Sequence, residues 1–180
     1  MGTLEDFTDF IVKERADQIP HTKRTYLEHA VCVYKDLKSW GCEEDVCNAG
    51  FFHSIYGTQG FDTYTLPLER RNELCELIGV RAERLAFLNC FIERSTFDPN
   101  LPKAEGPYTI ANRETNEAIE VSTEDFRDLI TIHLCDYCEQ MPRMKRWNYR
   151  REGYRMMAER LGGVAKMNYD RVIAMDTRDD

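Results

Sequence analysis

The sequence predicts a mostly α-helical protein that carries one small β-hairpin. Along most of the chain, apolar side chains recur every three to four residues, the spacing that places them on one face of a helix. Glycines and prolines interrupt these runs at points where helices are expected to end. Residues 108–122 alternate between apolar and polar side chains instead, and this pattern indicates two short antiparallel strands.

Three helices are expected in the first third of the chain, each bounded by a residue that caps or breaks a helix. They cover residues 4–18, 23–40 and 43–54. Thr22 is the expected N-cap of the second, because a threonine hydroxyl can accept a hydrogen bond from the first turn. Gly57 and Gly60 then mark a loop that separates these helices from the next helical region.

Helical spacing resumes beyond this loop and continues into the C-terminal region. The expected helices cover residues 67–78, 80–95, 123–141, 149–161 and 169–175. The hairpin at about 108–122 interrupts the series, and Pro142 is expected to end the helix that follows it. Because no internal repeat, low-complexity tract or linker is visible, a single domain is expected over residues 1–180, with a core over 20–140 and C-terminal helices over 149–175.

The composition indicates a soluble globular protein and disfavours two classes of partner. Hydrophobic residues make up 42% of the chain and charged residues 31%, which is ordinary for a domain with one sizeable core. The net charge of −8 disfavours a surface built to bind nucleic acid or anionic lipid. No apolar run approaches the roughly 20 residues that span a bilayer. Since the N-terminus is acidic and lacks the layout of a signal peptide, a cytoplasmic location is expected.

Cysteine usage is consistent with that location. The chain has seven cysteines, and an odd number favours reduced thiols, several of them buried as small apolar side chains. Cys135 and Cys138 have the spacing of half a zinc site, but no second pair accompanies them at a suitable distance. Since they lie within an amphipathic helical pattern, two core cysteines are favoured over structural zinc.

The histidines are the residues best suited to bind a metal ion or to take part in catalysis. His29 lies in the middle of a predicted helix and His53 near the end of the next, whereas His133 and Asp136 share one face of a late helix. Helices of a bundle build metal sites by converging such side chains. A single helix histidine is more often a hydrogen-bonded core or surface group. The apolar neighbours of His29 and His53 strengthen the metal interpretation, because a buried imidazole needs a partner.

Three stretches together resemble the motifs of the HD superfamily, a group of helical metal-dependent phosphohydrolases and their relatives named for a His-Asp doublet. The stretches are Thr25–Tyr34, Ala49–Ser54 and Leu134–Glu139. The resemblance covers about residues 20–140 and implies an HD-like helical bundle in which the 108–122 hairpin is an insertion. It also implies metal ligation by His29, His53 and Asp136.

The chain departs from the superfamily pattern at the second residue of the doublet, which is Ser54. The run His53-Ser54-Ile55-Tyr56-Gly57-Thr58 is similar to a small HD-like group in which the doublet reads His-Ser. Because serine is uncharged and a poor metal ligand, a site for two metals is disfavoured. The remaining two histidines and one carboxylate suit a single Fe, Mn or Zn ion with open coordination positions, and the residues do not choose among these metals.

Several further residues are candidates for catalysis or substrate binding around this site. The catalytic candidates are His133, Tyr56 and Ser54, and the substrate-binding candidates are His21, Arg24, Arg70 and Arg71. The arginines could hold an anionic substrate, although a solvated helix face explains them as well. A packing role for Tyr56 and a hydrogen-bonded helix-surface role for the two histidines also remain open. A basic stretch at residues 143–151 could face phosphate or a partner, but such runs are usually solvated.

Three functions are compatible with these features. The favoured one is a metal-dependent hydrolase of a phosphorylated small molecule or nucleotide, in which the metal activates water and basic residues hold the phosphate. The second is a non-haem iron oxygenase of the HD-related type, because two histidines and one carboxylate are also the ligands of that class. The third is a non-catalytic HD-like protein that binds a ligand. The expected partner is a small-molecule substrate that carries negative charge.

Overall fold

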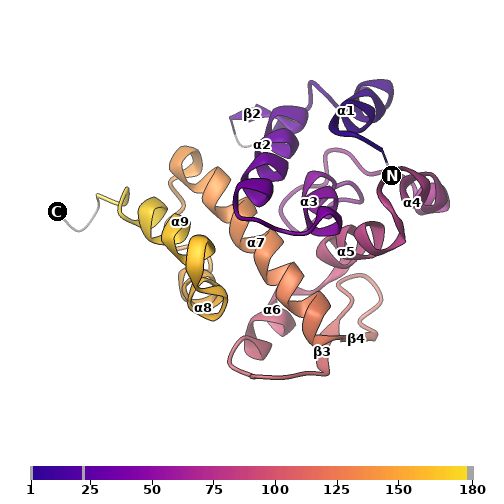
Figure 1. The fold of residues 1–180 in the computed structure, drawn as a ribbon. Helices are drawn as coiled ribbons and strands as arrows, with labels where there is room; N and C mark the ends of the chain where they lie inside the picture. Colours follow the sequence, from indigo (N-terminus) through magenta and orange to yellow (C-terminus); the bar gives the residue numbers. More distant parts are fainter. Residues whose placement is uncertain (1, 22, 178–180) are drawn as a thin grey trace. The chain divides into compact units, whose positions relative to one another are not determined.

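The computed structural model describes residues 2–21 and 23–177. Helices dominate it, and the only strands among the described residues form two small antiparallel pairs (Figure 1). The predicted mostly α-helical fold with a small hairpin is therefore confirmed. None of the helices within the described part of the chain combines the length and apolar character that a membrane span requires. The chain divides into two compact units, residues 1–90 and 91–180, and the single domain over 1–180 stays a prediction.

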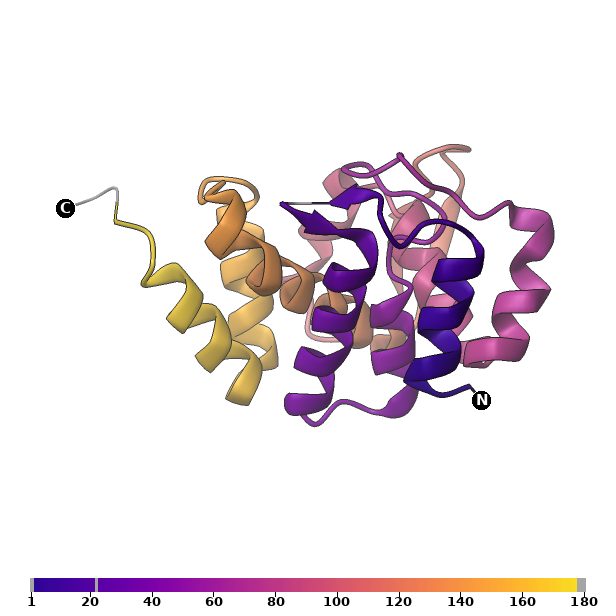
Figure 2. The same ribbon diagram turned by 90° about the horizontal axis from the view of Figure 1, so that it is seen from above.

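The first unit is built around the pairing of two helices, α2 and α3, which run side by side (Figure 2). Its elements are α1 (Leu4–Lys13), β1 (Pro20–His21), β2 (Arg24–Thr25), α2 (Tyr26–Ser39), α3 (Glu44–Phe51), a 3-10 turn η1 (Leu68–Arg70), α4 (Arg71–Ile78) and α5 (Val80–Phe91). Phe7 of α1 packs at 5.5 Å from Phe51 and 5.4 Å from Phe52, measured between ring centroids. This aromatic cluster fixes α1 against the end of α3.

The start of α2 differs from the prediction. The helix begins at Tyr26 and its N-cap is Thr25, whose hydroxyl accepts from the backbone N–H of Glu28 while the Glu28 carboxylate accepts from the backbone N–H of Thr25. The reason is that β1 and β2 pair just before the helix, with His21 opposite Arg24, and so hold this segment extended. Thr22, the predicted cap, lies outside the described residues.

The second unit is organised around the long helix α7. Its elements are α6 (Arg94–Phe97), a 3-10 turn η2 (Asp98–Asn100), β3 (Tyr108–Ala111), β4 (Ala118–Val121), α7 (Thr123–Met144), α8 (Arg151–Leu161) and α9 (Gly163–Ile173). The predicted hairpin is confirmed, with Tyr108 opposite Val121 at its base. Both α8 and α9 pack against α7.

Two boundaries in this unit differ from the prediction. α7 continues through Pro142 to Met144, since proline within the last turn removes one backbone hydrogen bond without breaking the helix outright. α9 begins at Gly163, six residues earlier than predicted. Gly162 and Gly163 both have positive φ, so the chain turns from α8 into α9 without a longer loop. Cys135 and Cys138 lie buried in the middle of α7, as predicted for core thiols.

An ion pair between Glu14, at the end of α1, and Arg70 gives the first unit a pH-dependent stability. The two guanidinium nitrogens of Arg70 donate to the two Glu14 oxygens over 2.7 and 2.9 Å. These bonds from Arg70 hold the pKa of Glu14 below its usual 4.5. The folded protein therefore binds this proton more weakly, so the stabilisation is complete above pH 4.5 and is lost as the pH falls through the folded pKa.

We expect Glu14→Gln to lower the free energy of unfolding by about 0.5–1 kcal/mol at neutral pH and by less at about pH 3. Urea unfolding of both proteins at the two pH values measures this difference. Glu73→Gln is the matched control, because Glu73 also pairs with Arg70 but is 51% exposed. A stability difference that stays constant between the two pH values would contradict the assignment.

Candidate metal centre

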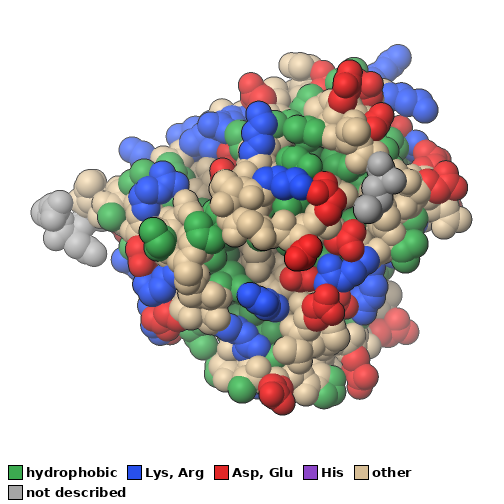
Figure 3. Space-filling model, viewed as in Figure 1, with side chains coloured by type: hydrophobic (Ala, Val, Ile, Leu, Met, Phe, Trp, Pro, Cys, Tyr) green, Lys and Arg blue, Asp and Glu red, His purple; other side chains and the backbone are tan. Residues whose placement is uncertain are grey.

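All four histidines of the chain are buried. His21, His29, His53 and His133 expose 6%, 0%, 4% and 3% of their surfaces. The face of the molecule drawn in Figure 3 accordingly shows many acidic and basic side chains but no histidine. Because a buried imidazole is costly without a partner, each ring has to be explained by what it contacts.

In the first unit, the structure brings His29 and His53 together. His29 lies in the first turns of α2, and His53 lies two residues beyond the end of α3. Since α2 and α3 pack against each other, the two rings meet with their centroids 5.0 Å apart and their planes at 80°. Their Nε2 atoms are 3.3 Å apart.

The orientation of His53 is fixed by backbone contacts on its other side. Its Nδ1 lies 2.7 Å from the carbonyl oxygen of Gly50. A carbonyl only accepts, so Nδ1 carries the proton and the Nε2 lone pair is directed to His29. The carbonyl of His53 in turn accepts from the Asn89 amide over 2.6 Å and from the Cys90 thiol over 3.3 Å. The residues after α3 are thus tied to α5.

This arrangement fits a metal ion. Two imidazole nitrogens that bind one tetrahedral ion at about 2.0–2.1 Å lie about 3.3–3.4 Å apart, which matches the separation of the two Nε2 atoms. Metal-binding histidines also commonly donate their other ring nitrogen to a backbone carbonyl, as His53 does to Gly50. Without an ion, the same geometry allows an N–H···N hydrogen bond between the rings.

His21 covers one face of His29. The two rings stack with centroids 4.4 Å apart and an angle of 11° between planes, and Phe61 contacts His21 from another direction at 4.5 Å. The β1–β2 pairing places His21 there, shortly before α2 begins. His21 therefore orients the His29 ring by packing, and its predicted role in substrate binding stays a prediction.

Ser54 and Tyr26 place two buried hydroxyls in the same region of the first unit. They expose 2% and 1% of their surfaces. Within residues 2–21 and 23–177, neither hydroxyl oxygen has a partner with normal hydrogen-bond geometry. Burial raises the pKa of Tyr26, and the nearby Ser54 hydroxyl opposes that rise. Since buried polar atoms are normally satisfied, this pair is suited to hold a water molecule next to His53.

In the second unit, α7 carries the predicted carboxylate Asp136 and its neighbour His133. Asp136 is half-buried and accepts a hydrogen bond from the Gln140 amide one turn further on. His133 stacks on Phe97 with centroids 5.0 Å apart, and its Nδ1 lies 3.5 Å from a guanidinium nitrogen of Arg150. Like His29 and His53, Asp136 offers one ligand atom to a metal ion.

Three further candidates of the first unit, Tyr56, Arg70 and Arg71, bind carboxylates of the same unit. The Tyr56 hydroxyl donates to Glu83 over 2.8 Å, and Arg71 donates to both oxygens of the same carboxylate. Burial, and then Glu83, raises the pKa of Tyr56, so its hydroxyl is protonated at neutral pH. Arg70 lies between Glu14 and Glu73. The predicted roles of these three residues in catalysis or substrate binding stay predictions.

Arg24, also a predicted substrate ligand, contacts the thiol sulfur of Cys32 at 2.8 Å. Two contributors to the site are missed by reasoning from the sequence. They are the carbonyl of Gly50, which orients His53, and Asn89, which holds the His53 backbone. The only signal in the sequence is the spacing of Gly50, three residues before His53. Asn89 gives no signal, because its contact spans 36 positions.

A family described as Domain of unknown function (DUF6817) matches residues 10–94, a little under half of the chain. The matched range contains His21, His29, His53 and Ser54, and it ends before Asp136. No curated protein and no solved structure matches the chain.

Proposed function

We propose that His29, His53 and Asp136 hold one divalent metal ion, and that the protein is an HD-like hydrolase of a phosphorylated small molecule or nucleotide. The observation that carries the proposal is the pair of Nε2 atoms 3.3 Å apart, with the proton of His53 directed away to Gly50. Asp136 is the third ligand that the HD-like motif implies.

The donor set suits one Fe, Mn or Zn ion. Two neutral imidazoles and one carboxylate carry a single negative charge and leave coordination positions open. When bound, such an ion lowers the pKa of water and polarises a phosphoryl oxygen, which is the chemistry that phosphoester hydrolysis requires. Ser54 stands where a second carboxylate would be needed to hold two ions.

The chain's own side chains prepare this site for water. Gly50 and His21 fix the two imidazoles, so that neither ring has to reorient on binding. The hydroxyls of Ser54 and Tyr26 can each donate a hydrogen bond to, or accept one from, a water molecule beside His53. The Tyr26 hydroxyl stays protonated at physiological pH, since burial raises its pKa. The two hydroxyls would therefore orient a water molecule without removing its proton.

Elemental analysis of the purified full chain, followed by a broad phosphoester panel, tests the proposal. We expect one ion per chain and release of phosphate from at least one phosphomonoester class. Bound metal without phosphate release would contradict the hydrolase. In that case, oxygen uptake with Fe(II) would identify the iron oxygenase, and its absence would favour a non-catalytic binding protein. Protein that takes up no metal would overturn the site itself.

The substitution Ser54→Asp provides a prediction specific to this chain. It would restore the His-Asp doublet, and a second ion per chain is expected in the presence of excess metal. Without metal the variant should be less stable by about 3 kcal/mol, because the added charge would be buried without a partner.

Measurements of metal stoichiometry and of thermal unfolding with and without a chelator check this prediction. Ser54→Asn is the matched control, since asparagine has nearly the same shape as aspartate without the charge. Equal stoichiometry in the aspartate and asparagine variants would show that Ser54 does not lie at a second metal position.

A further inference from the structure

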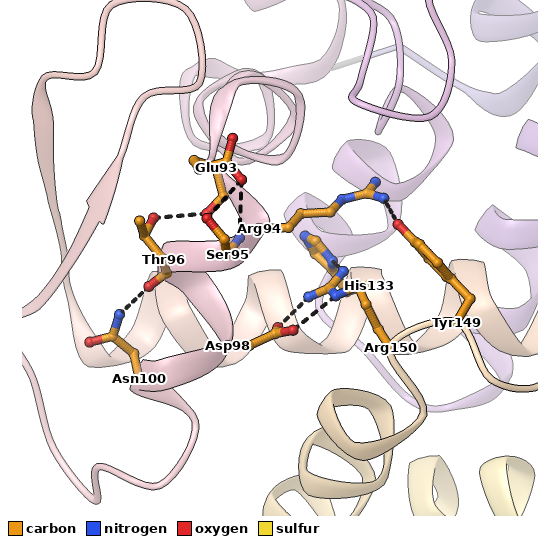
Figure 4. A network of polar contacts seen from close by, with 9 residues as sticks. All are labelled: Glu93, Arg94, Ser95, Thr96, Asp98, Asn100, His133, Tyr149 and Arg150. Atoms are coloured by element: carbon orange, nitrogen blue, oxygen red, sulfur yellow. Dashed lines mark hydrogen bonds and ion pairs between the residues drawn. The ribbon is translucent and has the colours of Figure 1, made fainter.

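The second unit contains a network of charged and aromatic side chains that the proposed metal site does not use. Figure 4 shows it between the short helix α6 and the start of α8. Its centre is Arg150, which is 11% exposed at its side chain and donates to both oxygens of Asp98. A guanidinium nitrogen of Arg150 also lies 3.5 Å from Nδ1 of His133.

A second arginine belongs to the same group. Arg94 of α6 donates to the hydroxyl of Tyr149 over 2.5 Å, and Tyr149 is 44% exposed. Both arginines act on Tyr154: burial raises the pKa of its hydroxyl, whereas the positive charges of Arg150 and Arg94 lower it. The carboxylate of Asp136 raises the same pKa. The Arg150 guanidinium lies 5.1 Å from the centre of the Tyr154 ring, and the charges of Arg94 and Asp136 also reach the Tyr154 hydroxyl.

The backbone of Arg150 is held in a costly conformation. Its φ is 45°, in the left-handed region that residues other than glycine seldom adopt. The bidentate contact with Asp98 compensates for this strain. Gly153 makes that contact possible, because a Cβ at this position would lie 3.0 Å from an Asp98 oxygen. The guanidinium is thus rigid before any ligand arrives.

We infer that Arg94 and Arg150 form the subsite for the phosphoryl group of the substrate, with Asp98 as a positioning residue. This inference rests on the proposed function. Guanidinium groups suit phosphate because their donors match its oxygens in pairs. His133 adds a ring nitrogen beside Arg150, and α7 carries Asp136 one turn away, so that a bound phosphoryl group would lie next to the proposed metal ligand. Tyr149 keeps Arg94 at the exposed rim of the subsite.

Binding of inorganic phosphate to the full-length protein, measured by calorimetry at low ionic strength, tests the inference. We expect Arg94→Gln to weaken phosphate binding about tenfold. Arg155→Gln is the matched control: it removes the same charge from α8, where Arg155 pairs with the exposed Glu152 and Glu159, and it should leave phosphate binding unchanged. Equal phosphate affinity in the two variants would overturn the subsite.

Asp98→Asn separates positioning from simple electrostatics. Removing a negative charge near the subsite should tighten phosphate binding if charge alone matters. If Asp98 holds Arg150 in place, binding should weaken about tenfold although both arginines remain. Circular dichroism of each variant checks that the helices are retained, and Arg94→Gln keeps the inference testable if Asp98→Asn does not fold. Tighter binding by Asp98→Asn would overturn the positioning role.

The metal content of the same samples distinguishes this inference from the proposed function. Protein that takes up no metal but loses phosphate affinity on Arg94→Gln would overturn the hydrolase and support the anion subsite. Protein that holds one ion and binds phosphate equally well with and without Arg94 would overturn the subsite alone.

Discussion

Substituting alanine for His53 is expected to remove divalent metal from the protein while its helices stay folded. His53 supplies one of two nitrogens that lie 3.3 Å apart, and a site reduced to one imidazole and one carboxylate should lose more than about tenfold in affinity. Elemental analysis after dialysis against the metal measures the loss. Metal bound at about 100 times its dissociation constant stabilises the folded state by about 2.7 kcal/mol, so the variant should also lose this increment.

The stability of the metal-free protein has to be measured separately. Alanine at position 53 removes the hydrogen bond to Gly50 and leaves a cavity, which should cost about 1–3 kcal/mol even with a chelator present. His21→Ala is the control, because His21 is also buried in the first unit but stacks on His29 without belonging to the proposed ligand set. It should lose stability and some metal affinity, because His21 orients His29, but it should still take up one ion per chain. Full metal content in His53→Ala would contradict the proposed site.

The second large effect is expected at Gly50, where α3 meets α2. A Cβ on Gly50 would lie 2.1 Å from Cδ1 of Leu37 and 3.4 Å from Cγ1 of Val33. Leu37 is fully buried, so its side chain cannot simply move into solvent. We expect Gly50→Ala to lower the free energy of unfolding by about 1–3 kcal/mol, measured by urea denaturation. The shift of α3 that relieves this clash would also move the Gly50 carbonyl that orients His53, so metal affinity should fall as well.

A double-mutant cycle with Leu37→Ala identifies the cause. In the Leu37→Ala background the added methyl group has room, and Gly50→Ala should then stabilise the protein by up to about 1 kcal/mol through higher helix propensity. The effect of Gly50→Ala on the free energy of unfolding is therefore expected to change sign between the wild-type and the Leu37→Ala backgrounds. The same loss in both backgrounds would show that contact with Leu37 is not what requires glycine here.

The helices and the two histidines could be predicted because their signals are local. The apolar spacing of residues 26–39 is read within a few turns. His29 and His53 follow from an HD-like pattern in which each motif occupies a single short stretch. Local signals of this kind do not depend on how distant parts of the chain pack.

The contacts that complete the candidate sites could not be predicted, because they join distant positions. Arg150 and Asp98 are 52 residues apart, and Tyr56 and Glu83 are 27 apart. Arginine, tyrosine and acidic residues are common, so nothing in the sequence distinguishes these pairs from solvated side chains. The misplaced start of α2 has a similar origin, since the strand pairing before Tyr26 gives only a two-residue pattern on each side.

The burial of His29 and His53 has a consequence for the kinetics of metal exchange. Neither ring exposes more than 4% of its surface, and His21 lies directly over His29. An ion held by these rings could leave only when a neighbouring segment opens transiently. One such segment is the β1–β2 pairing, which has two residues in each strand and includes His21. The rate of metal release would then depend on how often the β1–β2 pairing opens. Mutations that change the affinity for the metal would therefore differ from mutations that change its rate of release.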